Sequence, residues 1–267
     1  PSSPHAVGLA AEAAVRRARE QVAKALGVTR DEIVFTSGGT ESNNLVIKGV
    51  AAQHQRRGGS LVCLSTEHPS VLEAMRDLAT RGSFVHRTVP VDGTGVVDLP
   101  ALREQVNETT LLVSVAYVNN EIGTIQPIEQ IVAAVREKNP HTVIHVDAVQ
   151  ALGKVPVQPR KWGVDAVSLS GHKIHGPKGI GAVYVRRGLR LHALLHGGQQ
   201  EFGLRSGTEN VPGIAGFGEA VTLAVGEMEE LSARWRKLRH VLYDRLSALI
   251  PGTRVIGPAL DDAAPHI

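Results

Sequence analysis

The chain alternates short apolar runs with longer segments of helical periodicity over most of its length. Residues 33–35 and 61–64 are apolar runs typical of buried strands, and residues 84–89 also read as a strand. Residues 41–55 and 70–80 between them have the spacing of amphipathic helices. Strands that alternate with helices form a mostly parallel sheet with helices on both faces. The sequence therefore predicts an α/β fold, in which ligands bind beyond the carboxyl ends of the strands.

The same alternation continues to residue 185. We expect further strands at residues 111–116, 143–146, 166–169 and 181–185, and helices at residues 6–26, 99–105 and 128–138. A long charged helix is expected over residues 212–249, with a break near Gly226 and an end at residues 251–252. We therefore expect a large domain over residues 1–228, followed by a linking helix and the beginning of a small α/β domain over residues 229–267.

Both ends of the chain have the character of interrupted elements. The first residue is Pro1 instead of Met, and residues 264–267 read as the start of a further strand. We therefore expect this chain to be part of a longer protein.

Charge and composition exclude several classes of protein. The net charge of +3 comes from scattered basic residues, which form no footprint for nucleic acid. No apolar run approaches the roughly 18 residues of a membrane span, and no charged-then-apolar leader opens the chain, which predicts a cytoplasmic enzyme. The single cysteine, Cys63, excludes an intrachain disulfide, and the histidines form no metal-binding motif such as HExxH.

A lysine follows the strand expected at residues 166–169. Lys173 lies in the run SGHKIHGPKG, which spans residues 170–179. A lysine at a strand end, between glycines and beside a histidine, can lose its proton and form an imine with an aldehyde cofactor, and pyridoxal phosphate is the obvious candidate. Taken alone, Lys173 can equally be a surface lysine in a glycine- and proline-rich turn.

Two more strand ends offer groups that suit the same cofactor. In SGGTESNN, Gly39 and Thr40 join a strand to a helix and can present backbone N–H groups and a hydroxyl to a phosphate. Asp147 follows the strand at residues 143–146 and can hold a protonated pyridine nitrogen, which keeps the ring an electron sink. The alternatives are that Thr40 only caps the helix and that Asp147 is an ordinary turn residue.

Further polar motifs follow strands or precede the long helix. His68, in TEHP, can stack over a planar ring or shuttle a proton, and Asn120, in YVNNEIG, can bind a phenolic oxygen or a substrate carboxylate. The glycine-rich loop over residues 197–210 can reach a phosphate, including one in a neighbouring subunit. Each motif is also compatible with a purely structural loop. A nucleotide-binding protein is a further alternative, but neither GxxxxGK[ST] nor GxGxxG is present.

Taken in order, these motifs resemble those of the cysteine desulfurases of the NifS/IscS type. The motifs are GGTESNN, EH, NNEIG, DAxQ, SGHKxxGPKG and RSGT, and the resemblance runs from Pro1 to the C-terminus. These enzymes belong to the class V aminotransferase group of the fold-type I pyridoxal-phosphate enzymes. The resemblance implies the large domain of that fold in a homodimer. It also implies removal of sulfur from L-cysteine, giving L-alanine and an enzyme persulfide whose sulfur passes to an acceptor scaffold for iron–sulfur cluster or thio-cofactor assembly.

The resemblance also implies a role for each site residue. Lys173 would bind the cofactor covalently and later move the α-proton of the substrate, while Asp147 would hold the pyridine nitrogen. Gln150 would bind the phenolic oxygen, His68 would stack on the ring, and Asn120 would lie near that oxygen or the substrate. The ligands of the phosphate would be Gly39, Thr40, Ser170, His172 and, from the other subunit, Thr208.

One reactive group of that family has no counterpart in this sequence. The family's persulfide-forming cysteine lies in a Ser/Gly-rich loop beyond the position that matches Ile267, and its N-terminal strand segment and C-terminal arginine are also unmatched. Cys63 lies in an apolar run typical of a buried strand, where a thiol is unreactive. We therefore expect this chain to keep the cofactor domain without turning over cysteine. The open alternatives are a selenocysteine lyase, another class V aminotransferase and a non-catalytic fragment with the same fold.

Overall fold

A seven-stranded sheet organises the computed structural model, which describes Pro1 and residues 3–265. Its strand order is β1-β7-β6-β5-β4-β2-β3. All neighbouring strands are parallel except β7, which is antiparallel to both β1 and β6. The strands are β1 Ile33–Thr36, β2 Gly59–Leu64, β3 Phe84–Val89, β4 Thr110–Ala116, β5 Val143–Asp147, β6 Ala166–Ser170 and β7 Gly181–Val185. The prediction of a mostly parallel α/β sheet is confirmed.

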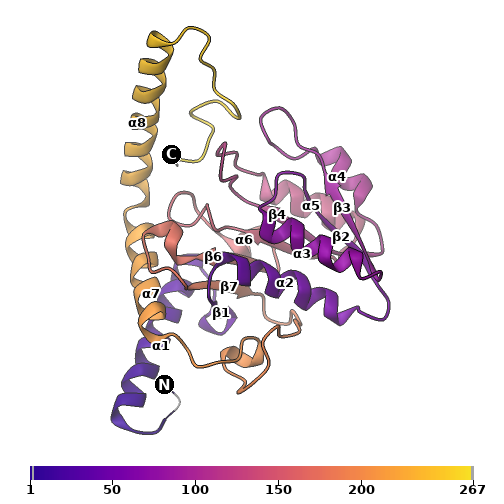
Figure 1. Cartoon of the computed structure of the whole chain (residues 1–267), viewed down its shortest axis with the longest axis vertical. Helices are drawn as coiled ribbons and strands as arrows, with labels where there is room; N and C mark the ends of the chain where they lie inside the picture. Colours follow the sequence, from indigo (N-terminus) through magenta and orange to yellow (C-terminus); the bar gives the residue numbers. More distant parts are fainter. Residues whose placement is uncertain (2, 266–267) are drawn as a thin grey trace.

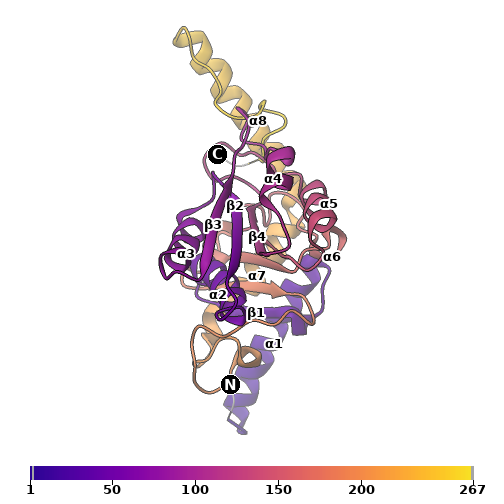
Figure 2. The ribbon, with the colours of Figure 1, turned by 90° about the vertical axis from the view of Figure 1, so that its right-hand side faces the viewer.

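Helices cover both faces of this sheet (Figures 1 and 2). Along β1 and β2, alternate side chains enter opposite cores. Val62 belongs to the core that also contains residues of α1, α4, α5 and α7, while Leu61 belongs to the core that contains residues of α2 and α3. The longer helices are α1 Ala6–Leu26, α2 Gly39–Gln53, α3 Pro69–Thr80, α5 Ile128–Lys138, α7 Val211–Gly226 and α8 Met228–Leu249; the shorter ones are α4 Leu99–Gln105 and α6 Pro159–Trp162. The expected helices are present, and α6 is an addition.

The antiparallel strand β7 joins the two strands that lead into the glycine-rich segments of the sequence. Its first residue, Gly181, pairs with Thr36 of β1 on one side and with Ser170 of β6 on the other. A Cβ atom at Gly181 would lie 2.7 Å from Gly38 Cα and 2.5 Å from the Leu169 carbonyl oxygen. Only glycine therefore allows the ends of β1 and β6 to approach this closely.

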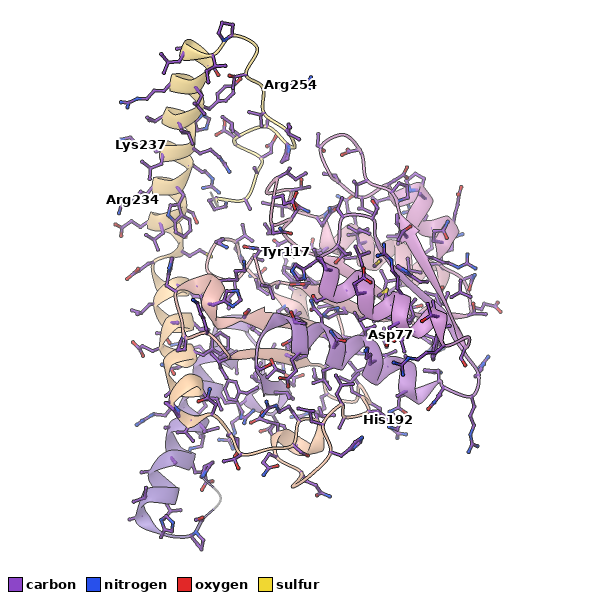
Figure 3. The ribbon with its side chains drawn as sticks, viewed as in Figure 1. Asp77, Tyr117, His192, Arg234, Lys237 and Arg254 are labelled. Carbon is purple, nitrogen blue, oxygen red and sulfur yellow. The ribbon has the colours of Figure 1, made fainter. Side chains whose placement is uncertain are left out.

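The long C-terminal helix breaks where the sequence predicts. Helix α7 packs on α1, whereas α8 begins after the break at Glu227 and projects beyond the sheet (Figure 1). Arg234 and Lys237 extend from α8 on the side away from the sheet (Figure 3). Among the α8 residues, only Ser232 is buried.

The segment after α8 differs from the prediction. Instead of starting a strand, Ala264 lies in an irregular segment, where its N–H donates to the Gly123 carbonyl and its carbonyl accepts from Arg239 Nη1. These bonds satisfy the Ala264 N–H and carbonyl groups. Residues 266–267 of the expected strand lie outside the described residues.

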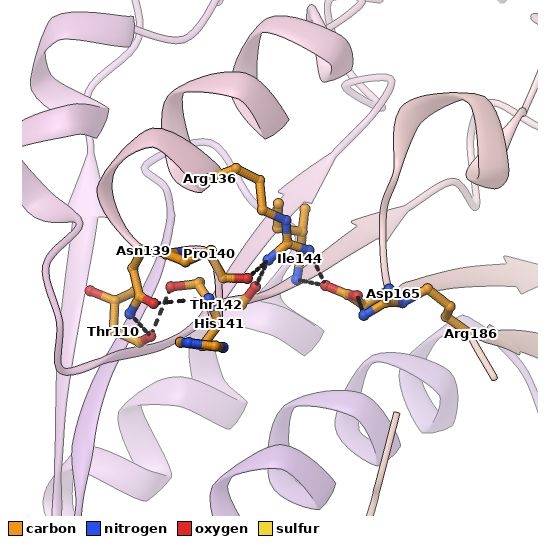
Figure 4. Close-up of polar contacts among 9 residues, drawn as sticks. All are labelled: Thr110, Arg136, Asn139, Pro140, His141, Thr142, Ile144, Asp165 and Arg186. Atoms are coloured by element: carbon orange, nitrogen blue, oxygen red, sulfur yellow. Dashed lines mark hydrogen bonds and ion pairs between the residues drawn. The ribbon is translucent and has the colours of Figure 1, made fainter. Parts of the chain in front are cut away.

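An ion-pair cluster closes the end of the sheet opposite the carboxyl ends of the parallel strands (Figure 4). Asp165, which immediately precedes β6, accepts from Arg136 Nη2 at 2.7 Å and from the Ile144 N–H at 2.8 Å. Arg186 Nη2 approaches its other oxygen at 2.6 Å. The Asp165 side chain is only 2% exposed, so these partners replace the water that it loses on folding.

Candidate cofactor site

Nearly all the predicted site residues meet at one cavity of about 280 Å³ beyond the carboxyl ends of the parallel strands. The predicted residues that line it are Gly39, Thr40, His68, Asn120, Asp147, Gln150, Ser170, His172 and Lys173. They come from segments that follow β1, β2, β4, β5 and β6, which is the edge at which α/β sheets bind ligands. Thr208 is the one predicted residue that does not line the cavity.

The turn from β1 into α2 forms one wall of the cavity. Gly38 has φ 151° and is the N-cap residue of α2, with no side chain capping the helix. A Cβ atom at Gly39 would lie 2.6 Å from Val149 Cγ2, so the loop after β5, which carries Val149, packs directly on the Gly39 backbone. Thr40 lies inside the first turn, so the alternative that it caps the helix is wrong. The uncapped helix N-terminus suits an anion.

Asp147 lies at the end of β5, and its side chain is held by two uncharged donors. The Val149 N–H donates to Oδ1 at 2.9 Å, and Asn43 Nδ2 donates to Oδ2 at 2.7 Å. Burial raises the pKa of Asp147, and the two hydrogen bonds and the charges of His68 and Lys173 only partly oppose that effect. A buried carboxylate of this kind is stabilised by a cation placed in the cavity.

Lys173 lies in the tight turn between β6 and β7. The turn closes through a hydrogen bond from the Gly176 N–H to the Gly171 carbonyl, and the Lys173 side chain is exposed. Beside it, Ser170 Oγ and His172 Nδ1 are 2.9 Å apart. Burial lowers the pKa of His172, and the charges of Lys173 and Lys178 act in the same direction.

His68 and Asn120 have distinct local settings. His68 is the N-cap residue of α3, and its Nδ1 accepts from the Ser70 N–H at 3.1 Å. In the Asn pair after β4, Asn119 Oδ1 accepts from the Glu121 and Ile122 N–H groups and so shapes the turn. Asn120, the second residue of the pair, lines the cavity.

A second, larger cavity adjoins the first. Its volume is about 790 Å³, and Asn120, Gln150 and Lys173 line both cavities. Its other walls come from α7 and α8, including Leu223 and Trp235, and from residues 152–154 and 174–177. Lys173 therefore lies where the polar cavity opens into a wider, more apolar space.

Four residues of the site were not predicted from the sequence: Asn43, Glu67, Ser70 and Lys154. Asn43 and Ser70 line the cavity, and Lys154 Nζ donates to Gln150 Oε1 at 3.0 Å. Burial raises the pKa of Glu67 well above its usual range, and the negative charge of Asp147 raises it further. Glu67 Oε1 accepts a hydrogen bond from the Ala116 N–H. One signal was available for Asn43, which is four residues before Ile47 and so shares the buried face of its helix.

The loop that carries Thr208 is anchored to α1 and β1 through Glu201. Arg19 pairs with both carboxylate oxygens of Glu201, at 2.6 and 2.7 Å, and Glu201 also accepts from the Phe35 N–H. Further along, Arg205 Nε donates to Glu41 Oε1 at 3.0 Å. Thr208 itself is exposed.

Cys63 lies away from this site, within β2. Its side chain is 0% exposed, and its Sγ is 3.3 Å from His86 Nε2. Burial raises the pKa of the thiol, and the nearby Glu67 adds to the effect. The prediction of a buried strand cysteine is confirmed.

The described residues contain neither a cluster that could hold a metal ion nor a helix that could span a membrane. Within Pro1 and residues 3–265, no group of three or more His, Cys, Asp or Glu side chains is arranged to hold a metal ion. Over the same residues, no helix is both long and apolar enough to cross a membrane.

Comparison with known proteins decides the family. The family model described as "Aminotransferase class-V" matches residues 1–267. The chain belongs to the class V aminotransferase family. Within that family it is similar to the cysteine desulfurase IscS of Dictyoglomus turgidum, with 43% identity over 97% of this chain and 65% of that protein. The chain spans 61–65% of the length of such curated relatives.

Similarity to solved structures agrees with this assignment. A NifS-like protein superposes with a TM-score of 0.95 and 46% identity over 99% of this chain and 72% of that chain. A structure described as SspA in complex with cysteine has a TM-score of 0.82 and 39% identity over 91% of this chain and 69% of that chain. The sheet described above is thus the large-domain fold of fold-type I pyridoxal-phosphate enzymes.

Enzymes of the class V family use pyridoxal phosphate, and the cavity has groups that suit its parts. The uncapped N-terminus of α2 suits the phosphate, and the buried Asp147 carboxylate, whose hydrogen-bond donors are uncharged, suits a protonated ring nitrogen. Lys173 provides the amine at the mouth of the cavity. The residues present therefore fit this cofactor.

Proposed function

We propose that this chain is the cofactor-binding part of a pyridoxal-phosphate-dependent cysteine desulfurase. Such an enzyme converts L-cysteine to L-alanine and passes the sulfur, through an enzyme persulfide, to an acceptor scaffold for iron–sulfur cluster or thio-cofactor assembly. The observation that carries the proposal is the convergence of an uncapped helix N-terminus, a buried aspartate and a lysine on one cavity. Similarity to proteins named as cysteine desulfurases, and to one solved with cysteine, supports the substrate.

Seven of the residues that line the cavity have a defined task in this proposal. Lys173 would hold the cofactor through its Nζ and, as a free amine, would take the α-proton of the substrate. Asp147 would hold the ring nitrogen in its protonated form, and Gln150 would donate to the phenolic oxygen. When bound, the cofactor supplies an electron sink for the carbanion that forms at the α-carbon. The phosphate ligands are Gly39, Thr40, Ser170, His172 and, from a second subunit, Thr208.

The assignment of Thr208 to a second subunit is part of a proposed homodimer. Thr208 is exposed, does not line the cavity of its own chain, and lies on a loop held in place by the Arg19–Glu201 pair. We also infer a large domain over residues 1–228, followed by a linking helix and the beginning of a small domain over residues 229–267. We further propose that the enzyme acts in the cytoplasm. The break at Glu227 supports that boundary.

Cys63 does not supply the persulfide-forming thiol of the proposed reaction. It is the single cysteine of the sequence, and it is buried in β2. We therefore propose that the 267-residue chain binds the cofactor but does not itself release alanine from L-cysteine. A selenocysteine lyase would differ only in its preferred substrate, which competition between the two amino acids in the complete enzyme would show.

Titration of the purified chain with pyridoxal phosphate tests the cofactor assignment. We expect a visible absorption band, a cofactor that borohydride fixes to the protein, and a labelled peptide that contains Lys173. Lys173→Ala should lose the fixed label, whereas Lys178→Ala, in the same turn, should keep it. Labelling at another lysine, or none in a folded chain, would overturn the proposal.

A further inference from the structure

Four side chains that line the smaller cavity form a continuous hydrogen-bonded path from Asp147 to His68. Asn43 Nδ2 donates to Asp147 Oδ2 at 2.7 Å and to Ser70 Oγ at 2.8 Å. Ser70 Oγ is in turn 2.8 Å from His68 Nδ1. All four residues line the same cavity, although they come from three separate parts of the chain.

The directions of these bonds follow from the donors available. The Asn43 amide has two N–H groups, and one serves Asp147 while the other serves Ser70. Because the Ser70 oxygen accepts from Asn43, its single hydrogen is free to point toward His68 Nδ1. The Ser70 backbone N–H donates to the same nitrogen at 3.1 Å. His68 Nδ1 therefore accepts two hydrogen bonds and carries no proton of its own.

Burial makes this path costly to disturb. Asn43 is 1% exposed, Asp147 7% and Ser70 8%, so a lost partner is not replaced by bulk water. Both Asn43 donors are used within the path, which fixes the orientation of its amide. The path thus links the position of Asp147 to the orientation of the imidazole.

We propose that Asn43 and Ser70 are positioning residues that hold His68 as the neutral tautomer protonated at Nε2. The tautomer of His68 follows from hydrogen bonds within the protein and does not depend on the proposed function. Only the contact of His68 with a bound cofactor or substrate rests on that function. With Nδ1 occupied, the ring offers the cavity its flat face and the Nε2–H donor. His68 then stacks on and hydrogen-bonds the bound molecules, and Nδ1 takes no part in moving protons.

Nitrogen-15 NMR of the histidine ring tests this assignment without the cofactor. The chain is labelled with ¹⁵N-histidine and studied at alkaline pH, and the His68 signals are identified by their loss in His68→Gln. We expect Nδ1 to resonate as an unprotonated nitrogen and Nε2 as a protonated one. A proton on Nδ1 in the wild-type chain would overturn the proposal, whatever the variants do.

Variants show whether the side chains cause the preference. Ser70→Ala removes the hydroxyl donor, so the ratio of the Nδ1–H to the Nε2–H tautomer should rise about five-fold, the change expected for one neutral hydrogen bond. Asn43→Ala should raise it less, and Ser70→Thr, which keeps a hydroxyl, should leave it near the wild-type value. Asn44→Ala, on the same helix but outside the path, is the matched control. An unchanged ratio in folded Ser70→Ala would contradict the role of the hydroxyl.

The cofactor titration separates this inference from the proposed function. If the tautomer is as expected but no cofactor binds, the proposed function fails and the path stands. If the cofactor binds through Lys173 but His68 carries its proton on Nδ1, the path fails and the proposed function stands.

Discussion

Lys154 Nζ donates a hydrogen bond to Gln150 Oε1 over 3.0 Å and thereby orients the Gln150 amide at the junction of the two cavities. With its oxygen turned toward Lys154, Gln150 has both N–H donors available for a ligand. Burial, with a smaller contribution from the Lys173 charge, lowers the pKa of Lys154 to about 8. The positive charge on Lys154 is therefore carried at a cost to the folded state.

The pH dependence of stability reports that cost. Between about pH 8 and the ordinary lysine pKa of about 10.4, the unfolded chain holds a proton on Lys154 that the folded chain releases, so wild-type stability rises with pH in this window. Lys154→Met lacks this contribution. The free energy of unfolding of the variant, relative to that of the wild type, should therefore be larger at pH 7 than at pH 10.5. Urea unfolding at both pH values measures this, with exposed Lys138→Met as control; a pH-independent difference would contradict it.

The Asp165 cluster should matter for stability and not for the cofactor. Asp165→Ala leaves Arg136 without its carboxylate and the Ile144 N–H without its acceptor, so we expect a loss of about 3 kcal/mol in the free energy of unfolding. Glu129→Ala, which breaks an exposed pair with Lys161, should lose less than about 1 kcal/mol. Urea denaturation measures both losses. Equal losses in the two variants would contradict the assignment.

The backbone at Gly39 should control cofactor affinity. In Gly39→Ala the new methyl group would meet Val149 Cγ2 at 2.6 Å, so either the α2 N-terminus or the Val149 loop must move. We expect pyridoxal phosphate to bind about ten-fold more weakly in an absorbance titration, equivalent to about 1.4 kcal/mol. Gly226→Ala, where an added Cβ has open space, should bind as wild type. Unaltered affinity in Gly39→Ala would mean that this turn does not contact the phosphate.

Cys63 should be unreactive in the folded chain. The thiol is fully buried, and burial raises its pKa, so little thiolate is present or accessible at pH 8. We expect an aromatic disulfide reagent to titrate close to one thiol per chain in denaturant and a negligible fraction without it over the same minutes. Rapid labelling of the native chain would show that β2 opens, and would reopen the question of Cys63 in sulfur transfer.

Much of the fold could be predicted from local pattern, because each strand and each long helix carries its own periodicity. Residues 61–64 read as a buried strand and residues 128–138 as a helix, and both are present. The four-residue α6 is too short to show a period. The reversed direction of β7 was also not predicted, because an apolar run has no polarity along the chain.

The site divides in the same way. Lys173, Asp147 and Gly39 were found because motifs with glycines or strand ends mark them. Asn43 was missed because its function comes from a contact with Asp147 across 104 residues. Lys154 was missed for a different reason, since an isolated lysine four residues after a glutamine is common in solvent-exposed helices.

The position of Gly181 between β1 and β6 has a consequence for biosynthesis. Next to it, Ser42 Oγ donates to the Ala182 carbonyl, a contact between residues 140 positions apart. The turn that precedes α2 leaves the ribosome early, but its neighbours in the sheet are made much later. Contacts of such long sequence separation form slowly, after a large loop has closed. A nascent chain that ends before β7 therefore has both the glycine turn and the lysine turn but lacks the strand that pairs with β1 and β6. The two turns are not held together, and the cofactor cannot stabilise the chain, until β7 has emerged.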